Sequence, residues 1–388
     1  MNCEGTMNDT IATCKSKHPI SVRCLFAWLV LMPFSFVALG SLGSILKLLT
    51  IVIIVYYFIK GGRLKYRKSA ILFTWFLYVI YYAVSLIWSL NLSDAIVYVI
   101  GYIQFFVLAF LFSSEIMDND DIRHLEDAWI FISIFCIIIF ITGGDKSIEY
   151  SDRSTLYMLG TFTDPNEFGG YFCIPTGLMC SRLFSENKRK SCIYLILIIV
   201  STYIVLRTGS RGALLALIVC IIAAMFRAAR MSFKNTLFII VLAILSYFII
   251  LNFMLPQISE SVLNRFTFES LKADGGSERK LIWTKSIKYF YEESIFRQVL
   301  GLGIFGGTFY KATMHNQLLQ NLIDGGFIGL LLYCVLMVLG FINIYKKYKN
   351  FVPGYIGMML LSMTLTMTSS YKPLWTLMIL GLIDIRRE

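Results

Sequence analysis

Long apolar runs alternate with short charged loops along almost the whole chain. The runs are roughly 15–25 residues long, close to what an α-helix needs to cross the hydrocarbon core of a membrane. They lie near residues 22–40, 44–59, 69–90, 96–113, 128–142, 167–184, 192–206, 213–226, 236–255, 317–345, 351–369 and 374–385. The pattern therefore predicts an all-α polytopic membrane protein with about twelve transmembrane helices.

The composition agrees with a membrane protein. Of the 388 residues, 57% are hydrophobic and only 15% are charged, and the mean hydropathy is +0.71. Soluble proteins usually carry about a quarter charged residues. The first apolar run leads directly into the second, so we interpret it as a retained helix rather than as a cleaved signal peptide. We therefore expect one integral membrane domain over residues 1–388 instead of two or three soluble domains.

The positive charges indicate an orientation in the membrane. Twelve spans place both termini on one side, and Lys and Arg concentrate in loops on that side, such as 60–68, 188–190 and 346–349. Both termini are therefore predicted to be cytoplasmic, and the long segment 256–314, between helices nine and ten, faces outward. This topology explains most of the net charge of +11. No basic run is interleaved with stacking aromatic residues, so nucleic acid is not an expected partner.

A polar stretch opens the tenth apolar run. Four of its side chains recur every three or four positions and so share one face of a helix: Gln317, Gln320, Asn321 and Asp324. Lipid cannot satisfy such a face, which must look into the bundle or into a wet cavity. Gly325 and Gly329 are four residues apart, which lets another helix approach closely. His315 is expected at the lip of a polar cavity; the alternative is a histidine with a purely structural role at the membrane interface.

An arginine lies in a very short turn between two apolar runs. Arg211 is flanked by Gly209, Gly212 and a serine. Charge at such a depth is costly and usually marks a functional site. A guanidinium group binds phosphate in a bidentate way, and the small neighbours leave room for a large anion. The alternative is an interfacial arginine that extends to lipid headgroups.

A second arginine lies in the long outward segment. Arg279 follows a Gly-Gly-Ser stretch, and Trp283 comes one helical turn later. The spacing of apolar residues predicts a helix from about 278 to 293, on the membrane surface or capping the bundle. Arg279 is thus a second candidate phosphate ligand, and the alternative is a solvated loop arginine. Gly301 and Gly303 predict a tight, flexible turn, with hinge positions for a lid over a substrate.

Asp164-Pro-Asn166 precedes the sixth apolar run. We interpret it first as a turn, because Asp before Pro initiates one. Alternatively it orients a sugar hydroxyl or, together with Glu167, holds a divalent cation.

Several classes of activity lose their usual signatures. The chain has no Walker A, H-E-x-x-H or G-x-S-x-G motif, which argues against ATP-driven transport, zinc proteolysis and serine hydrolysis. Its nine cysteines include no C-x-x-C, and we interpret those in the apolar runs as small buried residues, not as a disulfide framework or a metal site.

The motifs together resemble a known family. In chain order they are Asp164-Pro-Asn166, Thr208-Gly-Ser-Arg-Gly-Ala213, Gly-Ser-Glu-Arg279-x-x-x-Trp283, Gly301-Leu-Gly303 and His315-Asn316 followed after nine residues by Gly326-x-x-Gly329. This set, over residues 160–330, resembles the bacterial O-antigen ligase/polymerase superfamily. The resemblance implies a membrane glycosyltransferase of GT-C type with one large periplasmic loop.

The resemblance also implies a substrate and a reaction. The donor is a glycan on undecaprenyl diphosphate, and an inverting transfer joins it to a hydroxyl of an acceptor sugar. By this resemblance Arg211 and Arg279 bind the diphosphate, and His315 is the general base or orients the attacking hydroxyl. The weaker candidates for substrate binding are Asp164, Asn166, Asn316 and Gln320. Neither a metal nor another cofactor is required.

The acceptor stays open at this point. In a polymerase it is another lipid-linked repeat unit, and in a ligase it is lipid A-core. We favour the O-antigen (or capsular) polymerase, because such polymerases are numerous and diverse in sequence. A transporter or flippase of lipid-linked sugars is a third alternative, but it would need ionisable residues near the middle of the membrane. The resemblance implies the bacterial inner membrane as location, and a flippase and a chain-length regulator of the same pathway as partners.

Overall fold

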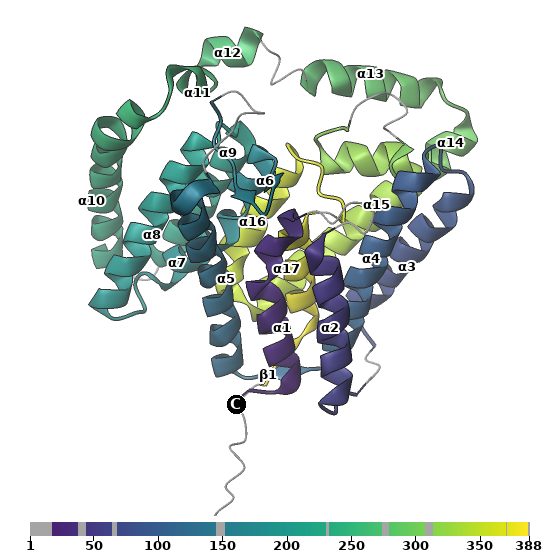
Figure 1. Cartoon of the computed structure of the whole chain (residues 1–388), viewed down its shortest axis with the longest axis horizontal. Helices are drawn as coiled ribbons and strands as arrows, with labels where there is room; N and C mark the ends of the chain where they lie inside the picture. The colour runs from purple at the N-terminus through teal and green to yellow at the C-terminus, as the bar shows by residue number, and fades with distance from the viewer. Residues whose placement is uncertain are drawn as a thin grey trace, which may run out of the picture.

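The protein is a bundle of α-helices with a layer of shorter helices across one end (Figure 1). The computed structural model describes residues 18–37, 44–63, 68–144, 152–229, 233–273, 279–306, 313–369 and 371–386. Each of the twelve expected apolar runs contains at least one helix in this described part.

The elements of the first half follow the apolar runs closely. They are α1 (Ile20–Val30), η1 (Met32–Phe36), α2 (Ile45–Ile59), α3 (Ala70–Val84), η3 (Ser85–Ile87), α4 (Leu92–Phe112), β1 (Ile116–Met117), α5 (Asn119–Ile139), η4 (Phe140–Gly144), β2 (Tyr157–Met158), β3 (Thr161–Phe162), α6 (Pro165–Gly170) and α7 (Cys173–Arg182). Strands β2 and β3 form a small antiparallel hairpin before α6.

The second half contains the longest helix and the short helices of the outward segment. Its elements are α8 (Lys188–Arg207), α9 (Arg211–Ala229), α10 (Phe233–Ile249), η5 (Ile250–Met254), η6 (Leu255–Gln257), α11 (Glu260–Asn264), α12 (Phe268–Ala273), α13 (Arg279–Glu292), α14 (Ile295–Leu300), α15 (Gln317–Lys347), η8 (Lys349–Phe351), α16 (Val352–Ser362), α17 (Lys372–Leu382) and β4 (Asp384–Ile385). The helix expected near 278–293 is confirmed as α13.

Helical structure of membrane-spanning length confirms the all-α membrane class. Among the described residues, six helices are long and apolar enough to cross a membrane: Ala70–Ile87, Leu92–Phe112, Asn119–Gly143, Lys188–Arg207, Arg211–Ala228 and Gln317–Lys347. Shorter apolar helices include Ile20–Val30, Ile45–Ile59 and Lys372–Leu382. The total of twelve spans and the GT-C type stay predictions.

The sixth expected run is divided into two helices. Residues 167–184 were expected as one span, but α6 ends at Gly170 and α7 begins at Cys173. Pro175 explains the break, because its ring cannot donate to the carbonyl of Tyr171 and would clash with it in a continuous helix. In the first turn of a new helix the same proline is tolerated.

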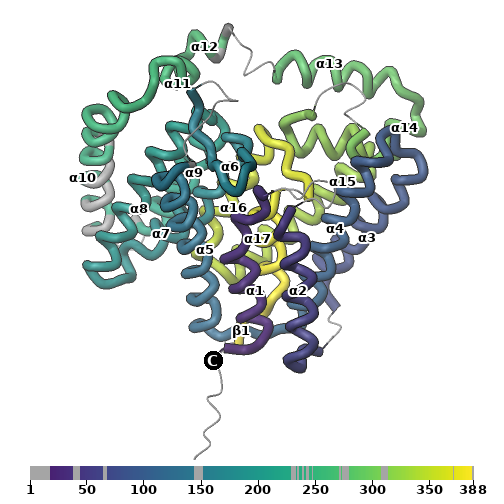
Figure 2. The backbone as a smooth tube through the Cα atoms, viewed as in Figure 1, coloured from purple at the N-terminus to yellow at the C-terminus, as the bar shows by residue number. Residues whose placement is uncertain are grey.

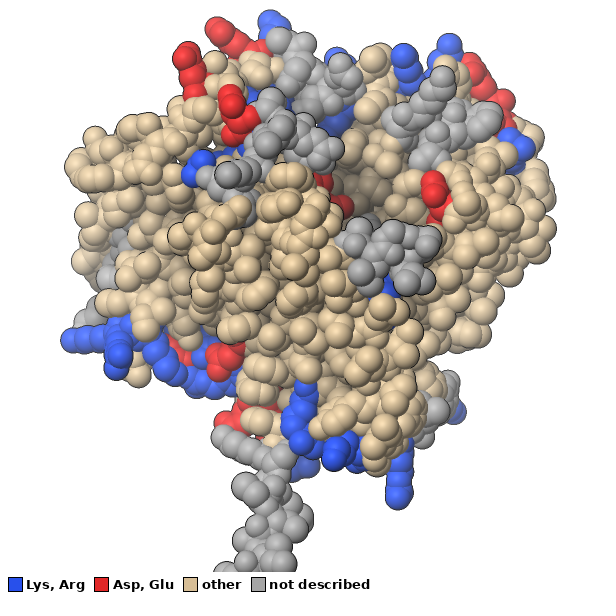
Figure 3. All heavy atoms as spheres, viewed as in Figure 1, with Lys and Arg blue, Asp and Glu red and all other residues tan. Residues whose placement is uncertain are grey.

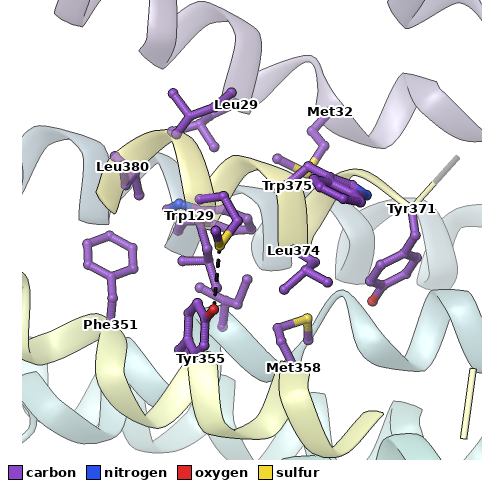
Figure 4. Close-up of a cluster of buried hydrophobic side chains, with 14 of the residues drawn as sticks. Leu29, Met32, Trp129, Phe351, Tyr355, Met358, Tyr371, Leu374, Trp375 and Leu380 are labelled. Carbon is purple, nitrogen blue, oxygen red and sulfur yellow. Dashed lines mark hydrogen bonds between the residues drawn. The ribbon is translucent and has the colours of Figure 1, made fainter. Parts of the chain in front are cut away.

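The last helix, α17, lies in the middle of the bundle, and all its residues from Lys372 to Leu382 are buried. The Trp375 ring lies 5.8 Å from that of Trp75 and 5.2 Å from that of Tyr102, between ring centroids. Figure 4 shows side chains of α17 gathered with those of α1, α5 and α16: Tyr371, Leu374, Trp375 and Leu380 with Leu29, Trp129, Tyr355 and Met358. In a membrane such contacts stabilise mainly through close packing, because lipid is as apolar as the side chains.

Helix α15 bends at Gly326, where φ is +60°. A Cβ atom at this position would lie 2.3 Å from the carbonyl oxygen of Val299, so only glycine fits. The bend releases backbone carbonyls of the preceding turn from the helix, and these need other donors.

The Gly301–Gly303 turn supplies those donors. The amide of Leu302 donates to the carbonyl of Ile323 (2.9 Å), and the amide of Gly303 donates to that of Asp324 (3.0 Å). Gly301, with φ +77°, approaches the backbone of α15 so closely that a Cβ atom would clash. The turn is as tight as expected. The hinge interpretation is wrong for these two glycines, because both are fixed against α15.

The glycines of α15 let α3 approach, as their spacing predicts. A Cβ atom at Gly325 would lie 2.7 Å from the Tyr82 hydroxyl, and one at Gly329 would lie 3.0 Å from it. Tyr81 donates its hydroxyl to the carbonyl of Gly325 (2.7 Å). The close contact therefore uses tyrosines of α3 on a glycine-lined groove of α15.

The polar face of α15 looks into the bundle, as predicted. Its four residues are at most 3% exposed: Gln317, Gln320, Asn321 and Asp324. The amide oxygen of Asn321 accepts hydrogen bonds from the hydroxyls of Tyr78 (2.9 Å) and Tyr82 (2.8 Å). The lower part of the face thus meets protein hydroxyls, while its upper part lies next to His315.

One end of the bundle, here called the inner end, holds the described beginning and end of the chain (Figure 1). There β1 pairs in parallel with β4, with Ile116 opposite Asp384, and the His18 ring is 2.7 Å from the Asp121 carboxylate. Lys and Arg gather at this end in Figure 3. A cytoplasmic inner end stays a prediction, and this concentration of positive charge supports it.

The opposite, outer end carries the short helices of the segment 256–314. Figure 2 shows the chain passing over this end from α10 through α11 and α12, and through α13 and α14 before it enters α15. The predicted site residues all lie on elements that begin at this end.

Candidate functional site

The outer end is hollowed between α6 and α15, beneath α13. Figure 3 shows this hollow in the upper half of the molecule, with acidic side chains at its edge. The described elements that begin around it are α6, α13 and α15, and each carries a predicted site residue in its first turn or just before it.

His315 lies in a backbone segment that is fixed on several sides. The Met314 amide donates to the Gln320 side-chain oxygen (3.1 Å), and the Met314 carbonyl accepts from the indole nitrogen of Trp283 (2.7 Å). Asn316 caps α15 by accepting from the amides of residues 318 and 319. Between these anchors His315 adopts a φ of +45°, a conformation that non-glycine residues seldom take and that is often found at functional sites.

Trp283 connects this segment to Arg279. Both residues lie on the first turns of α13, with Arg279 as its first residue. The hydrogen bond from Trp283 to Met314 therefore sets the distance between the start of α13 and His315. The sequence motif that joins this arginine to this tryptophan has a structural reason: the tryptophan positions the helix that presents the arginine.

Opposite charges act on His315 from two sides. Burial and the positive charge of Arg279 lower the pKa of His315 below its usual value of 6.5, and the carboxylate of Asp164 opposes that shift. The half-buried imidazole is therefore mainly neutral at pH 7 and can accept a proton. Thr313 lies within hydrogen-bond distance of its Nε2 atom (3.3 Å). The charges of two predicted residues from distant parts of the sequence thus act on a third.

Asp164 caps α6, which agrees with its interpretation as a turn. Its Oδ1 atom accepts from the amides of Asn166 (2.7 Å) and Glu167 (3.2 Å), and Pro165 is the first residue of the helix. The cap fixes the carboxylate at the positive end of α6, on the side where it acts on His315. The structural and the functional interpretation are therefore compatible.

Arg211 is the first residue of α9 and lies in a neighbouring cluster. It donates through Nη2 to the Ser270 hydroxyl (2.8 Å) and through Nε to the carbonyl of Arg265. Arg265 in turn donates to the carbonyl of Gly209 (3.1 Å). These bonds fix the guanidinium group of Arg211 between α9 and the segment that joins α11 to α12.

One protein family matches part of the chain. Residues 195–334 match the family model described as O-antigen ligase. This match supports the O-antigen ligase/polymerase superfamily that the motifs resemble. Members of this family are glycosyltransferase-like enzymes that act on lipid-linked glycans. No curated protein matches the sequence.

The family match covers only part of the site. It runs from within α8 into α15, so it includes Arg211, Arg279 and His315. Asp164, which acts on the same histidine, lies before the matched region.

Two further arginines lie beside the predicted site residues, and sequence reasoning did not single them out. Arg153 donates to the Thr208 carbonyl (2.8 Å) and to the Asn166 side-chain oxygen (3.1 Å). Arg153 and Arg265 both lie against Gly209, whose φ is +60°. Arg153 thus joins the α6 cap to the turn before Arg211. Its position eleven residues before Asp164 was the only signal in the sequence.

Two of the weaker candidates for substrate binding, Asn316 and Gln320, use their side chains to hold the backbone around His315. Asn316 caps α15, and Gln320 uses its oxygen for Met314 and its nitrogen for the Asp324 carboxylate (2.8 Å). Both therefore position His315. Gln317, which was not a candidate, is 1% exposed, and its side-chain oxygen has no hydrogen-bond partner among the described residues.

Among the residues that the structure describes, no three His, Cys, Asp or Glu side chains cluster as metal ligands would. Asp164, the N-cap of α6, and Glu167 in its first turn are not joined by a third such side chain in the described part of the chain. The metal-free reaction stays a prediction.

Proposed function

We propose that this protein polymerises oligosaccharide repeat units carried on undecaprenyl diphosphate into O-antigen or capsular polysaccharide. The reaction takes place at the periplasmic face of the bacterial inner membrane, which corresponds to the outer end of the bundle. The observation that supports this function best is the action of the Arg279 and Asp164 charges on His315 at the hollowed outer end of a membrane protein that matches the O-antigen ligase family model.

The proposed reaction is an inverting displacement. The oxygen of an acceptor hydroxyl attacks the anomeric carbon from the side opposite the diphosphate, and the bond from that carbon to the diphosphate oxygen breaks. The neutral imidazole of His315 takes the proton of the hydroxyl, and the electron pair of the broken bond stays on the diphosphate. The bond energy of the donor drives the transfer, which agrees with the absence of an ATP-binding motif.

The arginines stabilise the leaving group. Negative charge increases on the diphosphate as the bond breaks, and fixed guanidinium groups stabilise it without having to reorganise. Arg279 is positioned by Trp283 relative to His315, so base and leaving-group ligand keep a constant geometry. Arg211, held by Ser270 and the backbone, supplies a second cation from α9.

Asp164 assists the base. Its negative charge counteracts the effect of Arg279 on His315 and so keeps the imidazole basic enough to accept a proton. Asn166, which accepts from Arg153, and Asn316 and Gln320 hold the elements that present these groups.

Reconstitution distinguishes the proposed polymerase from the alternatives. Purified protein in liposomes receives a lipid-linked repeat unit, first alone and then with lipid A-core. A polymerase forms a ladder of longer lipid-linked glycans from the repeat unit alone. A product that forms only with lipid A-core identifies a ligase, and movement of the lipid-linked sugar without any transfer identifies a flippase.

Gene deletion gives an independent answer. Loss of a polymerase leaves surface glycan with a single repeat unit, because ligation continues. Loss of a ligase leaves lipid A-core without glycan, and long polymer accumulates on the lipid carrier. The second pattern would overturn the polymerase while keeping the roles of His315, Arg211 and Arg279.

A further inference from the structure

A buried lysine inside the bundle takes no part in the reaction described so far. Lys372 is the first residue of α17 and is 3% exposed. Its ammonium group donates to the Ser369 carbonyl (2.6 Å) and lies 5.2 Å from the ring centroid of Phe105. It occupies the positive end of its own helix, where a cation is unfavourable. Charge held inside a membrane bundle at such a cost usually has a function.

A second lysine lies close to the first. Lys47 is in the first turn of α2, again at the positive end of a helix. The two ammonium charges are near enough to repel each other. In the described part of the chain, neither lysine forms an ion pair with a carboxylate. Repulsion between two cations in a largely buried place is relieved when an anion binds between them.

Helix α4 brings the two lysines together. Gln104 donates to the Lys47 carbonyl (3.3 Å), and one residue later Phe105 lies beneath the Lys372 ammonium group. One turn earlier on α4, Gly101 packs against Ser369. Two turns earlier, the Tyr98 carbonyl accepts a hydrogen bond from the Ser369 hydroxyl (2.8 Å). The starts of α2 and α17, which carry Lys47 and Lys372, are therefore held against α4 by packing and hydrogen bonds.

One acidic side chain also faces this position. The carboxylate of Glu167, on α6, attracts Lys372 and acts on Tyr98. Two lysines and one carboxylate leave a net charge of about +1, enough to attract a phosphate. Lys47 is half-buried and open to an incoming group, whereas Lys372 is enclosed by α4 and α17.

We propose that Lys47 and Lys372 bind the diphosphate of the acceptor, the second lipid-linked glycan in the reaction. This inference rests on the proposed polymerase function, because only a polymerase takes two substrates that each carry a polyprenyl diphosphate. The acceptor diphosphate is not cleaved, so it needs a point charge to hold it. The bidentate arginines instead bind the donor diphosphate, whose negative charge increases as the bond breaks.

Binding stoichiometry tests the site directly. The wild-type protein in phosphatidylcholine nanodiscs is titrated with labelled undecaprenyl diphosphate, and we expect two equivalents to bind. Lys47→Met/Lys372→Met should bind one equivalent, and the control Lys346→Met, an exposed lysine at the inner end of α15, should bind two. Two equivalents on the double lysine variant, or none, would overturn the proposal. Replacement of the second equivalent by phosphatidylglycerol would also overturn it, because the ligand would then be a phospholipid headgroup.

Stability separates this role from a structural one. Methionine has a similar length and no charge, so Lys372→Met should fold with an unchanged or higher melting temperature. The transfer assay uses a constant concentration of a pre-elongated donor and varies the concentration of a single repeat-unit acceptor. For the double variant we expect the KM for the acceptor to rise at least tenfold. The kcat and the KM for the donor should stay within about twofold of wild type. A lower melting temperature, together with equal increases in the KM for donor and acceptor, would show that the lysines have a structural role. If wild-type protein transfers nothing to any acceptor, the proposed function fails instead.

Discussion

The two ends of the bundle hold their arginines in different ways. At the inner end, buried Arg182 is surrounded by acids: it donates to Asp127 (2.6 Å) and Glu186 (2.9 Å), and Glu126 lies 3.6 Å away. At the outer end, the acceptors of Arg153, Arg211 and Arg265 include backbone carbonyls, a serine hydroxyl and an amide oxygen.

The difference separates structural from functional charge. A buried arginine that is matched by carboxylates already has its counterions and holds helices together, here α5 to the end of α7. Backbone carbonyls and uncharged side-chain oxygens orient a guanidinium group without neutralising it. We therefore expect the arginine of the inner end to matter mainly for stability and those of the outer end mainly for binding a phosphorylated substrate.

The largest effect on transfer is expected at His315. We expect His315→Ala to lower the transfer rate by about 10²–10⁴-fold, the usual contribution of a general base, while the protein still inserts into the membrane. Radiolabelled glycan transfer in liposomes measures the rate. His124→Ala is the matched control, because His124 stacks on His18 at the inner end and should change the rate by less than about twofold. Wild-type turnover by folded His315→Ala protein would remove the histidine from the mechanism.

At the inner end, the corresponding change should affect stability instead. Arg182→Met leaves Glu126, Asp127 and Glu186 without their shared partner, and breaking a buried ion network of this kind costs about 3–5 kcal/mol. We expect a lower melting temperature in detergent and less folded protein, with near-normal transfer per folded molecule. A variant as stable as wild type but inactive would contradict the division between the two ends.

Lysine should not replace the outer arginines well. Arg211→Lys and Arg279→Lys keep the charge but lose the planar fork, and we expect each to slow transfer at least tenfold, or more than about 1.4 kcal/mol of transition-state stabilisation. Melting temperatures should stay within a few degrees. Near-normal rates in both would leave only a general electrostatic role. EDTA should change little; a loss that magnesium restores would instead indicate Asp164 and Glu167 as metal ligands.

Removing the hydrogen bond from Trp283 to Met314 should lower the transfer rate moderately. Trp283→Phe leaves the Met314 carbonyl without its indole donor and loosens the link between α13 and His315. We expect transfer to fall about three- to tenfold, and to fall little further when Arg279→Lys is added, because both changes disturb the same geometry. Trp88→Phe is the matched control, since the buried Trp88 indole nitrogen has no partner to lose. Fully additive losses would show that Trp283 does not act through Arg279.

Sequence patterns predicted what depends on local periodicity. Apolar runs predicted the helices, and the spacing of polar residues predicted the buried face of α15. Motif order singled out His315, Arg279 and Asp164, whose roles stay predictions. Contacts between distant segments were not predictable. Arg153 and Thr208 are 55 residues apart, and nothing in either segment indicates their bond. Lys372 was placed in a loop, because the last run was expected to begin at residue 374; the structure buries it as the first residue of α17.

The smallest expected effect, a shift of the pH profile, tests the outer end most specifically. Transfer requires neutral His315, so kcat/KM should decline on acidification with an apparent pKa below the usual 6.5, because burial and Arg279 disfavour the imidazolium. Arg279→Gln removes the nearby positive charge, so the pKa of His315 rises and the decline moves to higher pH. Asp164→Asn removes the negative charge but keeps a good helix cap, so the pKa falls and the decline moves to lower pH. Asp94→Asn, an exposed carboxylate at the start of α4, should leave the profile in place. General destabilisation would move both profiles in one direction, so only opposite shifts support the conclusion that these two charges act on one histidine.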